Sequence, residues 1–221
     1  MGTAVVFAGG PTSGPEGRGS AQALDVPPAE LVIAADSGLD LAVALGRRVD
    51  LVVGDMDSVS PSSLDRVERS GAEVRRYPTD KDATDLELAL DAAVAAGSDR
   101  VVVIGSSSGR MDHLLGGALV LASPRYASVE VEGWLGGALV APVHDRRRLH
   151  TTPGATVSLL PVFGAAEGVT TDGLRWALNS ARLEPGSTHG VSNEALADEV
   201  EVSLASGTLL VVLPADEEVA R

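Results

Sequence analysis

Two carboxylates stand two residues apart in a short glycine-containing run of this 221-residue chain. Asp55 and Asp57 follow the apolar stretch 51–53 and lie within the run 54–58. In extended backbone, residues two apart project to the same side, so both carboxylates can reach one hard cation. Mg²⁺ fits this pattern, because it takes a few carboxylates and completes its shell with water and phosphate oxygens.

Other acidic or glycine-rich runs share this position after an apolar stretch. They are 8–11, 36–38, 54–58 and 105–113, and a further acidic cluster at 80–85 precedes a predicted helix start. A lone Asp-x-Asp is typical of a turn, and an Asp before a helix is often only a cap. At least six carboxylates on one sheet edge, however, would repel one another unless a cation compensates. The runs together therefore predict a metal-dependent site.

Phosphoryl chemistry also needs positive groups that bind the transferring oxygens, and Lys81 and Arg110 lie within these runs. Arg110 precedes a predicted helix start, and backbone N–H groups of residues 106–109 are suited to bind a phosphate. A Gly-x-x-x-x-Gly-Lys-Ser/Thr motif is absent from the sequence, which excludes the P-loop fold. His113 is a base candidate by residue type, although a single His beside an Asp at a helix start is more often structural.

The strands and helices that position these residues are predicted to form an α/β domain. From residue 1 to about 126, short apolar runs alternate with helix-like segments, which predicts a mostly parallel sheet flanked by helices. The candidate strands are 4–7, 31–34, 51–53 and 101–104. In open α/β sheets, ligands bind outside the carboxyl ends of the strands, where the acidic runs stand.

Helix punctuation supports two of the helices. Ser60 followed by Pro61 is typical of an N-cap and a first helical residue. Thr84 and Glu87 have capping-box spacing, so a helix is predicted over about 85–96.

Beyond about residue 127 the pattern changes to short alternating stretches separated by turns, predicted at 185–186 and 206–207. This predicts a small C-terminal all-β sandwich. We expect an α/β domain over 1–140 and a β-sandwich domain over 141–221. Residues 129–135 fit either the last strand of the first sheet or the first strand of the second.

Composition limits the partners. With 31 acidic against 17 basic residues, the formal charge of −14 repels nucleic acid and anionic membranes, and neither is expected to bind. A nucleotide would need a metal ion and locally placed Arg or Lys. Cysteine is absent, which removes disulfides and thiolate chemistry and suits the reducing cytoplasm. The N-terminal residues 1–7 lack the pattern of a signal peptide, so a cytoplasmic protein is expected.

The runs, in this order, resemble the motifs of the thiamine pyrophosphokinases. That family reads Asp-x-Gly, Gly-Asp-Phe-Asp-Ser, Lys-Asp-x-Thr-Asp and Gly-Gly-Arg-x-Asp-His, and the matching positions here are 36–38, 54–58, 81–85 and 109–113. The similarity continues in the β half, at 173–179 and 186–194. Each motif alone is weak, but their shared order across two domains is a strong signal.

The resemblance implies an activity. Members of the family transfer the diphosphate of ATP to the hydroxyethyl group of thiamine, which gives thiamine diphosphate and AMP and requires Mg²⁺. It also implies a homodimer whose active sites are shared between the α/β domain of one subunit and the β-sandwich of the other.

The resemblance further implies three groups of site residues. Metal ligands would be Asp55, Asp57 and Asp85, with Asp82 near them. The ATP phosphates or the attacking hydroxyl would be contacted by Asp36, Lys81, Thr84, Arg110 and Asp112, and the expected catalytic residues are Asp36, Asp82, Arg110 and Asp112. Thiamine would lie at Trp176, Ser192 and Asn193. An indole face suits a cationic aromatic substrate, although Trp176 also fits a core or interface aromatic.

Three departures from the family pattern and two alternatives accompany this interpretation. Ser108 stands where the family usually has a second Gly, Gly117 where it has Asn, and Met56 where it has Phe. One alternative is a diphosphokinase for another small alcohol, which Trp176 together with Ser192 and Asn193 disfavours. The other is a non-catalytic thiamine- or nucleotide-binding regulator, which the intact set of carboxylates and Arg110 disfavour.

Overall fold

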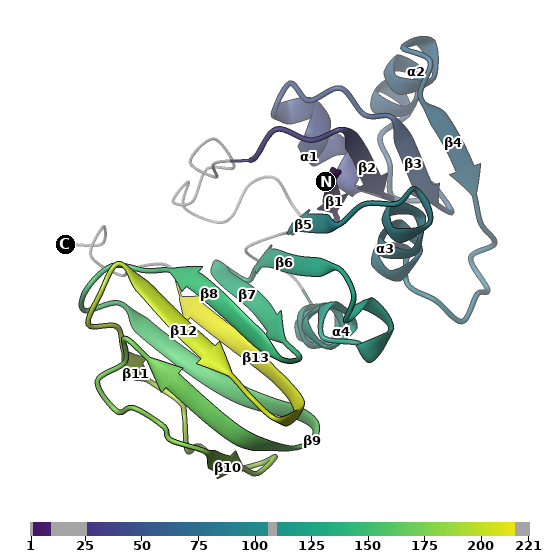
Figure 1. The fold of residues 1–221 in the computed structure, drawn as a ribbon. Helices are drawn as coiled ribbons and strands as arrows, with labels where there is room; N and C mark the ends of the chain where they lie inside the picture. Colours follow the sequence, from purple (N-terminus) through teal and green to yellow (C-terminus); the bar gives the residue numbers. More distant parts are fainter. Residues whose placement is uncertain (1, 10–25, 106–109, 215–221) are drawn as a thin grey trace. The chain divides into compact units, whose positions relative to one another are not determined.

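The computed structural model describes residues 2–9, 26–105 and 110–214 (Figure 1). Its helices are α1 (Gly38–Ala44), α2 (Pro61–Arg69), α3 (Asp85–Ala95), α4 (Met111–Leu121) and the 3-10 helix η2 (Pro124–Tyr126). Its strands are β1 (Thr3–Ala8), β2 (Leu31–Ala35), β3 (Leu51–Gly54), β4 (Glu73–Arg76), β5 (Arg100–Ile104), β6 (Glu130–Leu135), β7 (Ala138–Val143), β8 (Arg146–His150), β9 (Thr156–Asp172), β10 (Ala181–Leu183), β11 (Asn193–Glu194), β12 (Glu199–Ser203) and β13 (Ser206–Pro214).

The chain divides into two compact units. The first holds the residues up to Gly117 together with Ser128–Gly137, and the second holds Ala118–Ala127 and the residues from Ala138 onward. A domain boundary at residue 140 stays a prediction.

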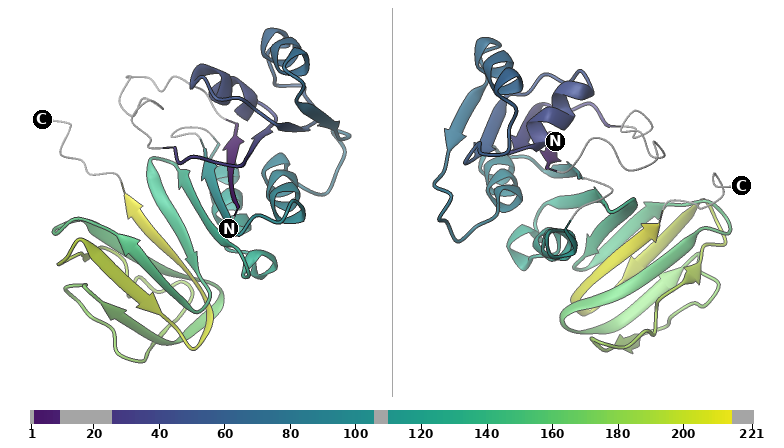
Figure 2. Two further views of the ribbon diagram at one scale, coloured as in Figure 1. Left: turned by 45° about the horizontal axis from the view of Figure 1, so that its top comes forward. Right: turned by 180° about the vertical axis from the view of Figure 1, so that it is seen from behind.

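The first unit is the α/β fold that the sequence predicts. Its strands lie in the order β4-β3-β2-β1-β5-β6, and each neighbouring pair is parallel. Because β6 pairs with β5, the ambiguous segment 129–135 supplies the last strand of this sheet. Helices α1 and α3 lie on opposite faces of the sheet (Figures 1 and 2).

The apolar strands explain why this sheet forms. The predicted runs 4–7, 31–34, 51–53 and 101–104 fall within β1, β2, β3 and β5, whose central residues are buried on both faces. Val5 and Phe7 share one core cluster with Leu39 and Ala42 of α1. Gly38 allows this contact, because a Cβ there would collide with the Phe7 carbonyl oxygen.

The helix starts follow local capping chemistry. The Ser60 hydroxyl accepts from the Ser63 N–H at 3.3 Å, and Thr84 Oγ1 accepts from the Glu87 N–H at 3.3 Å. Helices α2 and α3 therefore begin where the caps predict. Helix α1 has no side-chain cap, and the edge strand β4 is mostly exposed. Neither element was among the helices and strands expected from the sequence.

The second unit is antiparallel, with strand order β7-β13-β9-β12-β8 and with β10 and β11 paired to β9. Strand β9 pairs with β13 along residues 158–167 and with β12 along residues 170–172, so one long strand serves both neighbours. An apolar cluster packs inside the unit and includes Val157, Leu159, Val202 and Leu209. In the described residues, no helix combines the length and the apolar character needed to cross a bilayer.

The turn predicted at 206–207 is wrong. Ser206 and Gly207 begin β13, and the chain reverses at the two residues before them. Gly207 has φ +99° and lies at a register shift against β9, where a Cβ would collide with the backbone of Ala165 and Ala166. The glycine therefore serves a bulge rather than a turn.

Candidate active site

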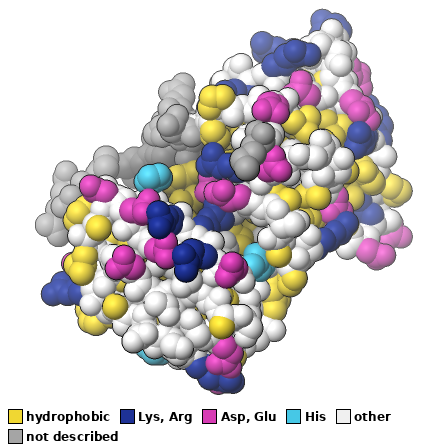
Figure 3. Space-filling view, viewed as in Figure 1, with side chains coloured by type: hydrophobic (Ala, Val, Ile, Leu, Met, Phe, Trp, Pro, Cys, Tyr) yellow, Lys and Arg dark blue, Asp and Glu magenta, His cyan; other side chains and the backbone are white. Residues whose placement is uncertain are grey.

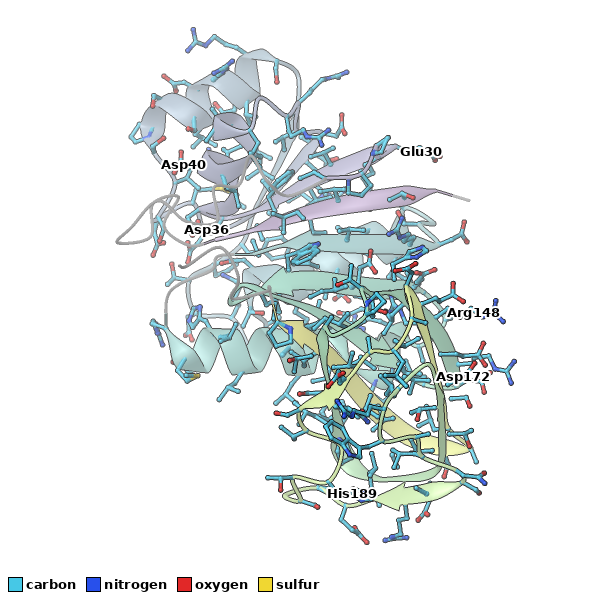
Figure 4. The ribbon with its side chains drawn as sticks, turned by 90° about the vertical axis from the view of Figure 1, so that its left-hand side faces the viewer. Glu30, Asp36, Asp40, Arg148, Asp172 and His189 are labelled. Atoms are coloured by element: carbon cyan, nitrogen blue, oxygen red, sulfur yellow. The ribbon has the colours of Figure 1, made fainter. Side chains whose placement is uncertain are left out.

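Three carboxylates meet at the carboxyl ends of two neighbouring strands in the first unit. Asp36 follows β2, and Asp55 and Asp57 follow β3. One carboxylate oxygen from each of the three lies within 4.8 Å of the other two. Figure 4 shows Asp36 at one end of β2 and Glu30 at the other, so the cluster lies at the edge that the parallel sheet predicts.

The loop reaches this arrangement by a different route from the extended backbone that the sequence suggested. Met56 has φ +67°, so the chain turns between the two carboxylates, and that expectation is wrong. The Asp57 N–H donates to Asp55 Oδ1 at 3.1 Å, and the Met56 side chain is buried in the core of the unit. The apolar residue between the two acids thus anchors the turn.

Gly54 lets a fourth carboxylate approach. Its φ of +142° is left-handed, and a Cβ would lie 3.1 Å from Asp36 Cβ and 3.2 Å from Asp85 Oδ1. Asp85 is the first residue of α3, so the glycine is packed between two acids from different elements. The role of Asp85 as a metal ligand stays a prediction, but the structure places its carboxylate beside the cluster.

Lys81 supplies the positive charge of this cluster. Its Nζ lies 3.1 Å from Asp85 Oδ1 and 3.8 Å from Asp55 Oδ2. Burial alone would lower the pKa of Lys81, but the carboxylates of Asp85 and Asp55, with a smaller contribution from Asp36, raise it. Lys81 is the only lysine of the chain, whose other basic side chains are arginines and histidines.

The residues fit a divalent cation. Asp36 Oδ1 is buried and has no hydrogen-bond partner among the residues that the structure describes. Burial, and then the charges of Asp85, Asp55 and Asp57, raise the pKa of Asp36 above its ordinary value. Three converging carboxylates, one of them with a buried oxygen that lacks a partner among the described residues, are suited to a hard cation such as Mg²⁺.

Asp82 and Thr84 lie in the loop before α3. Asp82 is exposed, and Thr84 caps the helix with its hydroxyl. Their expected roles at the reacting groups stay predictions.

Arg110 and Asp112 bind each other. Arg110 Nε donates to Asp112 Oδ1 at 3.1 Å and Nη2 donates to Oδ2 at 2.5 Å, in a forked pair whose side chains are both mostly exposed. This pairing, with the His113 N–H as a third donor, lowers the pKa of Asp112 to about 2. Arg110 stands directly before α4, as predicted, and the expected phosphate-binding run 106–109 lies outside the described residues.

The three residues expected at thiamine line one pocket of the second unit. This pocket of about 420 Å³ is formed by Trp176, Ala177, Leu178, Thr188, His189, Gly190, Val191, Ser192 and Asn193. The Trp176 side chain is 58% exposed, which excludes the alternative of a buried core aromatic. Figure 4 labels His189, one of these lining residues, on the connection between β10 and β11.

The indole has a charged neighbour, Arg175, which was not among the residues expected at thiamine. The Arg175 guanidinium lies 5.6 Å from the centroid of the Trp176 ring, and its Nη1 lies 2.8 Å from Glu194 Oε2. Ser192 has φ +58°, and its N–H donates to the Ser158 hydroxyl at 3.0 Å. On the face that Figure 3 shows, charged side chains of both signs are interspersed over the strand-rich unit. Arg175 differs from an ordinary surface arginine in that its guanidinium lies close to the Trp176 ring.

Two family models match this chain along most of its length. The catalytic domain of thiamin pyrophosphokinase matches residues 26–132, and the vitamin B1 binding domain of thiamin pyrophosphokinase matches residues 145–209. The chain belongs to the thiamine pyrophosphokinase family. Members of this family are ATP-dependent diphosphotransferases, and the carboxylate cluster and the pocket fall in the first and second matched regions respectively.

Curated relatives and solved structures agree with this membership. The thiamine pyrophosphokinase of Bacillus subtilis is 26% identical over 172 residues, which are 74% of this chain and 77% of that protein. Thiamine pyrophosphokinase 1 of Oryza sativa subsp. japonica is 26% identical over 180 residues, 76% of this chain and 67% of the relative. The crystal structure of the Bacillus subtilis enzyme has a TM-score of 0.80 at 23% identity and covers 97% of this chain and 99% of its own. The structure of thiamin pyrophosphokinase from Candida albicans has a TM-score of 0.73 at 13% identity, and the match covers 97% of this chain and 90% of that one. These structures share the fold.

Proposed function

We propose that this chain is a thiamine diphosphokinase that transfers the diphosphate of ATP to the hydroxyl of thiamine. The observation that carries the proposal is the convergence of Asp36, Asp55 and Asp57 within 4.8 Å, with a buried oxygen of Asp36 left without a partner among the described residues. Such a cluster suits the metal-dependent chemistry of phosphates, and family membership gives the reaction class.

The proposed reaction forms one bond and breaks one. The hydroxyl oxygen of thiamine attacks the β-phosphorus of ATP, and the bond from that phosphorus to the oxygen bridging the α-phosphate breaks. The hydroxyl proton is released to solvent, and AMP leaves with the bridging oxygen. Lys81 and Arg110 would bind the transferring phosphate oxygens, and Asp36, Asp82 and Asp112 would orient the reacting groups.

Mg²⁺ is the proposed cofactor. Asp55, Asp57 and Asp85 would hold it together with Asp36, and when bound it neutralises phosphate charge. The Lys81 ammonium forms ion pairs with both Asp55 and Asp85. A cation bound by these carboxylates would therefore change the electrostatic surroundings of Lys81.

The pocket of the second unit is the proposed thiamine site. Trp176 offers an exposed indole face to the cationic ring, and Ser192 and Asn193 line the same pocket. ATP would bind at the carboxylates of the first unit. We place the enzyme in the cytoplasm, in keeping with its lack of cysteine.

The proposed assembly is a homodimer with shared sites, in which the carboxylates of one chain serve the pocket of its partner. Mixing an Asp57→Asn chain with a Trp176→Ala chain tests this directly, because one mixed dimer then holds one intact site and one doubly altered site. Activity recovered above both parents supports sharing. No recovery, when mass measurement shows that subunits have exchanged, places both residues in the same subunit's site.

The function is tested by incubating the purified chain with ATP, Mg²⁺ and thiamine and separating the products. Thiamine diphosphate and AMP should appear, and the Asp57→Asn variant should form neither. If the parent forms AMP only with another alcohol, the acceptor is different. If ATP is unchanged with every alcohol while thiamine still binds, the protein is a binding regulator.

A further inference from the structure

Asp40 ties two helices of the first unit together. It lies in the first turn of α1, four residues after Asp36. Its Oδ1 accepts from the Ser60 hydroxyl at 2.7 Å and from the Ser63 hydroxyl at 2.5 Å, and its Oδ2 accepts from the Ser60 N–H at 3.2 Å. Figure 4 shows Asp36 and Asp40 near the same edge of the sheet. The sequence motifs did not include Asp40.

Ser60 is the far end of the loop that carries Asp55 and Asp57. This loop leaves β3 after Gly54 and ends at Ser60, the N-cap of α2. At its near end, the Asp36 N–H donates to the Val53 carbonyl oxygen at 2.8 Å. Residues 36–40 therefore bind both ends of the loop, and residues 55–59 lie between these two points.

We propose that Asp40 is a positioning residue for this loop: by holding Ser60 it fixes where Asp57 stands relative to Asp36. The proposal rests on the proposed function, because it takes the three carboxylates as the site of a divalent cation. It adds a residue that touches neither the cation nor the substrates and acts through the backbone between Asp57 and Ser60.

A carboxylate suits this position better than an amide. Burial alone would raise the pKa of Asp40, but the hydrogen bonds from the hydroxyls of Ser63 and Ser60 and from the Ser60 N–H lower it. An asparagine offers one acceptor oxygen and turns an NH₂ group toward a donor. Asp40→Asn therefore either sets its NH₂ against the Ser60 N–H or removes the oxygen that accepts from the two hydroxyls.

The loop has other anchors, so losing Asp40 should loosen it without unfolding the unit. Met56 and Val59 are both less than 10% exposed and pack in the same core cluster. They hold the middle of the loop, whereas Asp40 binds both the N–H and the hydroxyl of Ser60 at its end. The expected defect is weaker binding of the cation rather than a lost fold.

The test measures binding of Mn²⁺ alone to the full chain by titration calorimetry, for the parent and three variants. Asp40→Asn should weaken Mn²⁺ binding roughly five- to twenty-fold, the effect of a lost charged hydrogen bond. Val67→Ala loosens the core cluster that also holds Met56 and Val59 but leaves the hydrogen bonds of Asp40 in place, so it is the control for general destabilisation and should change the binding less than about twofold. Asp57→Asn should abolish it.

In turnover, Asp40→Asn should raise the half-saturating Mg²⁺ concentration while kcat at saturating Mg²⁺ stays within about threefold of the parent's.

Each outcome decides one question. If Asp40→Asn and Val67→Ala weaken Mn²⁺ binding equally, Asp40 only stabilises the helices and the inference is wrong. If Asp57→Asn binds Mn²⁺ like the parent, the proposed metal site itself is wrong. Should Asp40→Asn not fold, Ser60→Gly takes its place, because it removes the hydroxyl and keeps a residue that N-caps tolerate. Its Mn²⁺ binding should be weaker than that of Val67→Ala, and equal binding overturns the proposal.

Discussion

Asn193 binds both main-chain polar groups of Trp176. Its Oδ1 accepts from the Trp176 N–H at 3.1 Å, and its Nδ2 donates to the Trp176 carbonyl oxygen at 2.8 Å. Asn193 is only 5% exposed, and its Oδ1 also accepts from the Glu194 N–H at 2.9 Å. A buried amide therefore holds the segment that presents the exposed indole to the pocket.

Asn193→Asp should raise the KM for thiamine roughly ten-fold and destabilise the second unit by about 2 kcal/mol. The change keeps an acceptor for the Trp176 N–H but sets a carboxylate oxygen against the Trp176 carbonyl. Kinetics and thermal unfolding measure the two effects. An unchanged KM in a destabilised variant would show that the amide matters for the fold alone.

Trp176→Ala should raise the KM for thiamine roughly five- to thirty-fold and leave the KM for ATP almost unchanged. A desolvated contact between a cation and an indole contributes about 1 to 2 kcal/mol, which gives that range. Phe163→Ala is the matched control, because Phe163 is an aromatic side chain with 60% exposure in the same unit and does not line the pocket. Equal effects from both substitutions would remove Trp176 from the thiamine site.

Gly54→Ala should reduce kcat at least about a hundred-fold, because a Cβ there displaces Asp36 or Asp85 by a few tenths of an ångström. Gly71→Ala provides a control for backbone strain. Gly71 also has a positive φ, of +85°, but open space surrounds its Cβ position. Both variants should lose about 1 to 2 kcal/mol of stability, and only Gly54→Ala should lose activity. Full activity in Gly54→Ala contradicts the packed arrangement of the acids.

Lys81→Met should bind Mg²⁺ or Mn²⁺ several-fold more tightly than the parent and yet turn over about a hundred-fold more slowly. Removing the ammonium takes a positive charge away from the cation site, and it also removes a group that binds phosphate. Lys81→Arg keeps the charge and should bind Mn²⁺ within about twofold of the parent.

The single lysine offers a direct spectroscopic readout. Reductive ¹³C-methylation labels Lys81 and the N-terminal amine and no other side-chain amine, because the chain has one lysine. The Lys81 resonance should shift when Mg²⁺ is added. A resonance that ignores both Mg²⁺ and ATP would place Lys81 outside the site.

Arg110→Lys should lower kcat about a hundred-fold with little change in stability, because a point ammonium cannot reproduce the forked contact. The ion pair with Asp112 is exposed, so its loss should cost the fold little. Arg69→Lys, in the last turn of α2, is the control for a surface arginine. If Arg110→Lys keeps the parent's kcat, as Arg69→Lys should, then Arg110 is only a surface charge at a helix start and does not bind the transferring phosphates.

Local chemistry made part of this fold predictable from the sequence. The caps at Ser60 and Thr84 place α2 and α3, because a side chain and an N–H three residues later suffice to start a helix. The buried strands follow from their apolar runs. By contrast, β4 alternates Glu73 and Arg75 with a single apolar Val74, so its pairing with β3 depends on tertiary context.

The candidate site shows the same division. Sequence order placed Asp55, Asp57 and Lys81 near one sheet edge, because parallel strands bring their carboxyl ends together. It did not give the left-handed turn at Met56 or the contact of Gly54 with Asp85, since both depend on packing between elements distant in the chain. Asp40 was invisible for the same reason: its partners lie 20 and 23 residues away.

The position of the bond that breaks in ATP tests the central claim most directly. Two samples of ATP, labelled at the α- or at the β-phosphate, are incubated with the protein, Mg²⁺ and thiamine, and the products are separated and counted. Diphosphate transfer predicts that the α label appears only in AMP and the β label only in thiamine diphosphate, in equal amounts. Recovery of the β label in ADP, with a thiamine monophosphate as the other product, would contradict the account.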